Sequence, residues 1–210
     1  MENFKEITLD DAVKLINENA SIFKEEILDE LNAFYDVAGK IVLSSGATAL
    51  DNLVVGNDIV IINGDLTVTD TIEDCEGVDS SLLIVLGNVN CKNLITLSSM
   101  YITGDLNASN AVLGDSLCDY VLDVGGNIVT KTILDYGHCI AAEQSITVSN
   151  VFSFNSVSDK NGVIAQNLER DEMVDDIVEM DDDEKMENLW KTITYIKSGG
   201  EIFRESELQN

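Results

Sequence analysis

A repeat of about twenty residues runs through the middle of the chain and restricts the folds that are open to it. In each copy two short apolar stretches flank a glycine that is followed by Asp or Asn; these glycines are Gly64, Gly87, Gly104 and Gly126. Weaker copies centre on Gly46 and Gln144, so that successive anchor positions lie 18, 23, 17, 22 and 18 residues apart. Copies this short cannot each bury a core, so we expect them to stack as the turns of a solenoid.

Apolar residues recur at fixed distances from these anchor positions. Two positions after the anchors the residues are Leu66, Val89, Leu106, Ile128 and Ile146. Residues two apart share one face of a strand, so this column is expected to point into the core. Four positions after the anchors the side chains become smaller, and Cys91 is therefore interpreted as a small core residue.

Small polar residues occupy the position six after each anchor. They are Asn52, Asp70, Asn93, Asn110, Thr132 and Asn150. Asn and Asp suit a turn between strands because they hydrogen-bond the nearby backbone. In stacked coils these side chains are expected to form a ladder along the solenoid axis. A polar binding stripe is the functional alternative.

These columns predict an all-β solenoid, a right-handed parallel β-helix of about six coils over residues 41–167. An antiparallel sandwich is the rival fold, but it would need hairpin turns roughly every 8–12 residues. The predicted hand rests on the general preference of crossovers between parallel strands. It also rests on the lack of the six-residue repeat that is typical of left-handed β-helices.

The open strand edges at the two ends of a solenoid must be covered. The sequence predicts α-helical caps at both ends. Residues 1–40 are the N-terminal helical cap, with an apolar stripe at Phe23, Ile27, Leu31 and Phe34. Residues 168–210 are an acidic C-terminal helical cap, with a stripe at Met186, Leu189, Trp190, Ile193 and Ile196. Helical spacing of apolar residues also runs through the acidic segment 168–185.

The charge of the chain restricts its partners. With 39 acidic and 12 basic side chains the formal net charge is −27, which disfavours nucleic acid and anionic membranes and favours a basic protein partner. Simple solubility is the alternative explanation. The first ten residues lack the apolar core of a signal peptide, and no apolar run is long enough to cross a bilayer. We therefore expect a cytoplasmic protein.

The residues that carry common enzyme chemistry are sparse. The four cysteines form no zinc-binding spacing, and the one histidine, His138, is expected at a turn or on the surface. No phosphate-binding loop is present. We therefore predict no cofactor, no metal and no enzymatic activity. A carbohydrate-active β-helix enzyme remains an alternative, because paired carboxylates suffice for glycoside hydrolysis.

The segments Ile62-Asn63-Gly64-Asp65-Leu66 and Ile102-Thr103-Gly104-Asp105-Leu106 resemble the strand pairs of bacterial β-solenoid proteins of the polymer-forming, bactofilin-like kind. They are also similar to those of solenoid immunity proteins encoded beside polymorphic toxins. The resemblance covers about residues 41–152 and implies either a self-assembling scaffold or an immunity protein. Bactofilins polymerise end to end and carry little beyond the solenoid. The amphipathic stretches at both ends of this chain depart from that pattern, so we expect a monomer or small oligomer that binds a basic toxin domain.

The two longer coils carry extra acidic residues after their second strand. These insertions supply the candidate partner-binding residues Glu73, Asp74, Glu76, Asp79, Asp115 and Asp119. Because the insertions are two coils apart, they are expected to emerge roughly 10 Å from each other on one side of the solenoid. Solvated bulges without a partner are the alternative, and the acidic segment 168–185 is the second candidate surface.

Overall fold

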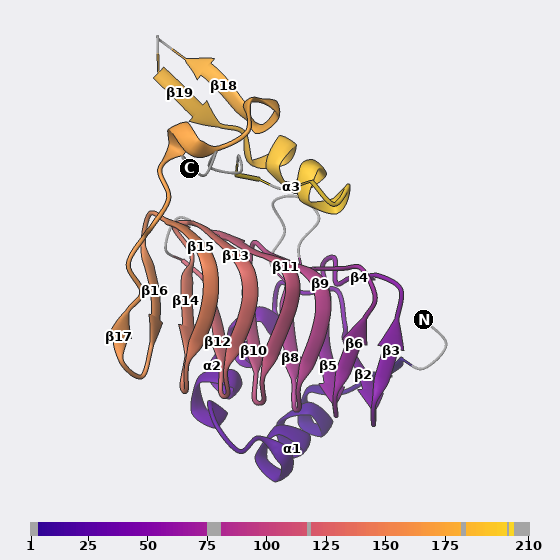
Figure 1. The fold of residues 1–210 in the computed structure, drawn as a ribbon. Coiled ribbons are helices and arrows are strands. Elements are labelled where there is room, and N and C mark those ends of the chain that lie inside the picture. Colours follow the sequence, from indigo (N-terminus) through magenta and orange to yellow (C-terminus); the bar gives the residue numbers. More distant parts are fainter. Residues whose placement is uncertain (1–3, 75–80, 117–118, 182–183, 201, 204–210) are drawn as a thin grey trace.

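The strands of this protein wind into a parallel β-solenoid of about six turns, accompanied by three α-helices. The computed structural model describes residues 4–74, 81–116, 119–181, 184–200 and 202–203 (Figure 1). In each turn a strand of one long sheet, sheet A, is followed by one or two strands of a second, sheet B. This arrangement confirms the predicted parallel β-helix.

Sheet A runs the length of the solenoid. Its strands, in spatial order, are β1 (Lys5–Ile7), β2 (Ile41–Ser45), β5 (Ile59–Asn63), β8 (Leu82–Val85), β10 (Ser99–Ile102), β12 (Val121–Val124), β14 (Cys139–Ala142), β16 (Ser156–Asp159) and β17 (Gly162–Val163). The strands from β2 to β16 are parallel, whereas β1 and β17 at the two edges are antiparallel to their neighbours. The two edges of sheet A are therefore covered by strands.

Sheet B contains a bend that divides it into two halves. Its strands are β3 (Thr48–Leu50), β4 (Leu53–Val54), β6 (Leu66–Val68), β7 (Thr71–Glu73), β9 (Val89–Thr96), β11 (Leu106–Asp115), β13 (Ile128–Tyr136) and β15 (Ile146–Ser153). In the first two coils the strand breaks at the bend, giving β3 and β4 and then β6 and β7. In β11 the register shifts there, between Ala108 and Ala111. Each coil thus contributes a third short stretch of β-strand, after the bend, which the repeat pattern did not predict.

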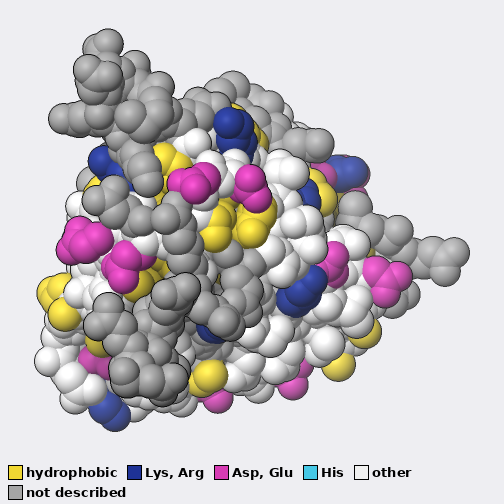
Figure 2. All heavy atoms as spheres, turned by 45° about the horizontal axis from the view of Figure 1, so that its top comes forward, with side chains coloured by type: hydrophobic (Ala, Val, Ile, Leu, Met, Phe, Trp, Pro, Cys, Tyr) yellow, Lys and Arg dark blue, Asp and Glu magenta, His cyan; other side chains and the backbone are white. Residues whose placement is uncertain are grey.

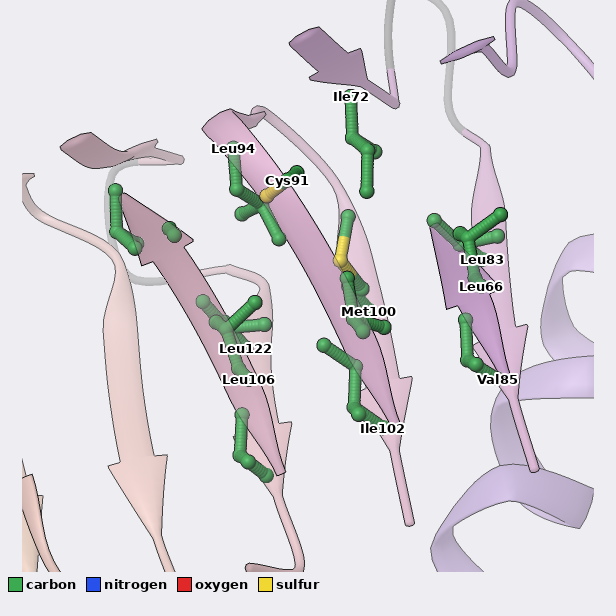
Figure 3. Close-up of a cluster of buried hydrophobic side chains, with 14 of the residues drawn as sticks. Leu66, Ile72, Leu83, Val85, Cys91, Leu94, Met100, Ile102, Leu106 and Leu122 are labelled. Atoms are coloured by element: carbon green, nitrogen blue, oxygen red, sulfur yellow. The ribbon is translucent and has the colours of Figure 1, made fainter. Parts of the chain in front are cut away.

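The core column agrees with the predicted register. Leu66 pairs with Val89, Val89 with Leu106, and Leu106 with Ile128, and all four side chains are fully buried. Cys91 is also a buried core residue, as expected. Figure 3 shows Leu66, Cys91 and Leu106 directed into the interior together with Leu83, Met100 and Ile102 from sheet A.

The recurrent glycine followed by Asp or Asn has two structural causes. The anchor glycines stack so closely that a Cβ on Gly87 would lie 2.5 Å from the carbonyl oxygen of Gly64. The side chains after the glycines form a hydrogen-bonded ladder between coils. Asp65 accepts the backbone amide of Asn88 at 2.7 Å, Asn88 accepts that of Asp105 at 2.9 Å, and Asp105 accepts that of Asn127 at 2.7 Å. The motif therefore fixes the register of adjacent coils.

A second ladder lies at the bend of sheet B, where the polar turn column was predicted. Asn110 donates to Asn93 at 2.8 Å, and Asn93 donates to the hydroxyl of Thr71 at 3.2 Å. Thr71, not Asp70, occupies the ladder position in its coil, because Asp70 turns toward Lys92 at 3.6 Å. Asn93 is fully buried, so this ladder satisfies polar groups inside the bend.

The N-terminal helices lie on the outer face of sheet A. Helix α1 (Leu9–Asn19) begins at the N-cap Thr8, whose hydroxyl accepts the amide of Asp11, and α2 (Lys24–Tyr35) follows. Their apolar faces pack on outward side chains of β2, β5, β8 and β10 (Figure 1). The predicted helical end caps are not confirmed. Antiparallel β1 and β17 border sheet A, and Phe4 and Ile164 pack on the core.

The C-terminal segment packs on the outer face of the second half of sheet B. It contains the 3-10 turns η1 (Arg170–Glu172) and η2 (Asp175–Ile177), the antiparallel strands β18 (Val178–Asp181) and β19 (Glu184–Glu187), and helix α3 (Leu189–Lys197). Turns and a hairpin thus replace the helix expected over 168–185. Met173, Ile177, Ile193 and Ile196 are buried against Ile95, Leu113, Leu134 and Phe152 of sheet B.

Candidate functional site

Two of the acidic residues predicted to be exposed are buried at the end of β7. Glu73 is 7% exposed, and its carboxylate accepts a hydrogen bond from Lys197 of α3 at 2.6 Å. Asp74 is fully buried. Glu76 and Asp79 lie outside the described residues. Glu73 and Asp74 therefore act inside the structure, the first by holding the C-terminal segment on sheet B.

Asp74 belongs to a polar column at the corner between the two sheets. Its carboxylate accepts hydrogen bonds from the Thr96 hydroxyl and, at 2.8 Å, from the Leu97 amide of the next coil. Asp135 repeats this arrangement, accepting the Ser153 hydroxyl at 2.6 Å and the Asn155 amide at 2.9 Å. A buried carboxylate with satisfied oxygens stabilises a corner that would otherwise leave backbone amides unpaired.

Burial raises the pKa of the Asp74 carboxyl to about 7 from 3.8, although the hydrogen bond from Thr96 and those from backbone amides oppose the shift. A raised folded-state pKa contributes stability below pH 3.8, and this contribution is lost as the pH rises through about 7. We predict that, as the pH rises from 3.8 to about 7, the unfolding free energy falls less in Asp74→Asn than in the wild type. The two falls should differ by at least about 1.4 kcal/mol, the equivalent of one pKa unit. Urea denaturation at several pH values measures this.

Asp119→Asn is the control for that experiment, since Asp119 is exposed and lies outside the buried corner. The difference between the unfolding free energies of the wild type and Asp74→Asn should shrink with rising pH. A constant difference would show that Asp74 does not titrate in this range in the folded protein.

The second predicted loop differs from the first. Asp115 ends β11 and is half-buried, and its pKa is raised by burial and then by the charge of Asp135. Asp119 is exposed. Asp74 and this loop do lie along one edge two coils apart, because Asp74 contacts Thr96 and Thr96 pairs with Gly114. The described ends of the two insertions thus lie on one edge of the solenoid, and Asp119 is the exposed residue among the described candidates.

His138 fills space inside the same corner. It lies in the short connection between β13 and β14, which fits the expected turn, but it is fully buried, and a Cβ on Gly114 would lie 2.7 Å from its Cβ. Burial lowers the pKa of His138 to about 4, partly offset by the Val121 carbonyl and the charge of Asp135. His138 therefore serves packing.

A cluster of carboxylates that the sequence analysis missed lies beside α2 on the outer face of sheet A. We call it the sheet A acidic cluster; it contains Glu26, Asp29, Glu30, Asp123 and Glu143. Asp123 is on β12, two residues after Val121, which packs against the apolar cluster of α1 and α2, and its side chain is half-buried. Among the described residues, no lysine or arginine forms an ion pair with any of the five.

The pKa shifts in this cluster arise first from burial and then from the like charges of neighbouring carboxylates. Burial raises the pKa of Asp123 to about 6, and the charges of Glu143 and Glu26 raise it further. Partial burial raises the pKa of Glu30, and Asp29 adds to the effect. The pKa of the Tyr101 hydroxyl between them is raised by burial and by the same carboxylates. A cationic side chain placed here would relieve the repulsion.

A further exposed surface lies on the C-terminal segment. Trp190 of α3 is 55% exposed and lines a shallow groove of about 370 Å³. Figure 2 shows this side of the molecule, where hydrophobic side chains reach the surface among acidic ones. An exposed tryptophan next to charge is typical of interaction surfaces.

The described residues contain no group of three or more His, Cys, Asp and Glu side chains arranged to hold a metal ion. None of the helices in this part of the chain is both long and apolar enough to span a membrane. Comparison with known proteins found no match to the chain among family models, curated proteins or solved structures.

Proposed function

We propose that this chain is a non-enzymatic protein-binding solenoid that recognises a basic partner, and that it acts as an immunity-like partner of a basic bacterial toxin domain in the cytoplasm. The observation that supports the proposal is the sheet A acidic cluster, in which five carboxylates gather without an ion pair to a lysine or arginine among the described residues. Repulsion between the carboxylates lowers the stability of the fold. The positive charges of a basic partner would offset this repulsion by attractive contacts with the same carboxylates.

The test takes a basic protein from among the products of the genes that neighbour this one and measures complex formation by calorimetry at low and high salt. We expect affinity to fall as salt rises, because the attraction between the opposite charges is screened. Asp123→Asn combined with Glu143→Gln should weaken binding and flatten the salt dependence, whereas Asp119→Asn is the single-charge control. If co-expression does not protect cells from the neighbouring protein and no complex forms, the immunity proposal is wrong.

A self-assembling scaffold is the second candidate, because both edges of sheet B lack a further strand partner in the described chain; at one of them β15 pairs only with β13. Within the described chain β3 pairs only with β6, and β4 only with β7. An open edge can pair with a second copy. Light scattering at increasing concentration separates the candidates: growing filaments favour the scaffold, and a constant monomer or small oligomer favours the binding protein.

We further propose that the coils wind right-handed, following the general preference of parallel crossovers.

A further inference from the structure

The groove beside α3 is lined by two elements that are fixed relative to each other. Trp190 and Tyr195 of α3 line it together with Asp176 of η2. The backbone amide of Asn188 donates to the carbonyl of Ile177 at 2.8 Å, which joins the start of α3 to η2. The buried face of α3, at Thr192, Ile193 and Ile196, holds the helix on the protein. The exposed ring is thus displayed from a supported helix.

The floor of the groove is made apolar by hydrogen bonds within the helix. The hydroxyl of Thr194 donates to the carbonyl of Trp190 at 2.8 Å, and that of Ser198 donates to the carbonyl of Tyr195 at 2.7 Å. Tyr195 packs against Gly200, where a Cβ would overlap its ring. With both hydroxyls bound to the backbone, the groove offers ring faces and carbon atoms along its length.

The electrostatic surroundings favour a cation over a neutral ligand. Residues 168–200 contain eleven acidic and four basic side chains, and Lys191 is the one basic residue that lines the groove. Asp176 is exposed at the rim. A cation over the face of a tryptophan is attracted by the ring quadrupole, and a nearby carboxylate adds a directed hydrogen bond.

We propose that this groove binds an arginine side chain of a basic protein partner, with the guanidinium stacked on Trp190 and hydrogen-bonded to Asp176. Arginine fits better than lysine because its planar guanidinium can stack on an aromatic face and also fork onto a carboxylate. The same segment contains an internal example: the guanidinium of Arg170 lies 5.5 Å from the ring centroid of Phe154. The proposal rests on the proposed recognition of a basic protein and names one contact for it.

The chain offers a direct probe, because Trp190 is its one tryptophan. A short arginine-rich peptide without aromatic residues is titrated into the full-length protein, and tryptophan emission and calorimetric affinity are both followed. Binding is expected to change the emission, and a lysine peptide of equal length should bind more weakly. Trp190→Ala should lower the affinity for the arginine peptide roughly threefold to tenfold.

Three further variants separate stacking from other effects. Trp190→Leu keeps apolar area but removes the ring, so it should lose affinity as Trp190→Ala does. Asp176→Asn should weaken binding more than Asp119→Asn, which removes an exposed charge outside the groove. Circular dichroism of each variant verifies that the fold is retained. Full affinity in Trp190→Leu would overturn the stacking of arginine on the ring.

The outcomes distinguish this proposal from the proposed function. If the peptide binds while tryptophan emission and the affinity of Trp190→Ala are unchanged, the groove is not the site, but recognition of basic partners stands. If no basic peptide binds at low salt and the neighbouring basic protein also fails to bind, both proposals are wrong.

Discussion

Replacing Gly87 with alanine is expected to destabilise the solenoid by roughly 3–5 kcal/mol, which is a large part of the stability of a typical domain. The added Cβ would lie 2.5 Å from the carbonyl oxygen and 2.6 Å from the carbonyl carbon of Gly64. Both atoms belong to the backbone of the preceding coil, so no side-chain rotation can relieve the overlap. Adjacent coils would have to separate, which would weaken their hydrogen bonds. Urea denaturation followed by circular dichroism measures the effect.

Gly56→Ala is the matched control for this substitution. Gly56 has φ +65°, but no heavy atom lies within 4 Å of an added Cβ. Alanine there should cost only the left-handed backbone penalty, about 1–2 kcal/mol. If Gly87→Ala were no more destabilising than Gly56→Ala, the stacked glycines would not be as close as the structure shows.

Leu106→Ala is expected to lower the unfolding free energy by roughly 2–5 kcal/mol. Leu106 is fully buried on β11 between Val89 and Ile128 of the neighbouring strands. Truncation removes apolar contact and leaves a cavity that the regular stacking of coils cannot close, because neighbouring backbones are held by their ladders. Thermal and urea unfolding both report this loss.

Val129→Ala provides the comparison for Leu106→Ala. Val129 follows the core residue Ile128 but points outward and is 44% exposed. Its truncation should change the stability by less than about 0.5 kcal/mol, as is usual on a surface. Equal effects of the two truncations would contradict the assignment of inward and outward faces.

The parts of the fold that the sequence predicts are those with a strict periodic cause. The column of Leu66, Val89, Leu106 and Ile128 follows from alternation along strands, and the anchor glycines follow from their close stacking. The third stretch of each coil was missed because its residues do not alternate. Pairs such as Leu94-Ile95 are apolar on both faces, since one residue enters the core and the next meets the C-terminal segment. Continuous apolar runs of this kind mark strands covered on both sides.

The terminal segments show where amphipathic patterns stop being informative. The stripe at Ile27, Leu31 and Phe34 predicts which side of α2 is buried, but it does not say what the helix packs against. Both a solenoid end and the outer face of sheet A present apolar surface. The outward-facing residues Ile59, Ile61 and Ile84 indicate where α2 packs. They make the outer face of sheet A apolar, so this face must be covered.

The candidate site was harder to predict because charge in a sequence does not reveal its surroundings. Glu73 and Asp74 look like loop acids, yet one pairs with Lys197, more than a hundred residues later, and the other is held by the next coil. The sheet A acidic cluster joins residues from α2, β12 and the end of β14. Only Asp123 indicates this cluster in the sequence. It stands in the same outward-facing column of sheet A as Ile84 and Tyr101 on the neighbouring strands.

The ladder after the anchor glycines alternates between charged and neutral members: Asp65, Asn88, Asp105 and Asn127. Each aspartate therefore has an amide for a neighbour, and consecutive carboxylates are two coils apart, roughly 10 Å. Deleting one coil would set Asp65 directly against Asp105, two acceptors of like charge with no side-chain donor between them. Deleting two coils would keep the alternation intact. The unit by which this solenoid can be shortened or lengthened is thus a pair of coils, which matches the alternation of short and long anchor spacings along the chain.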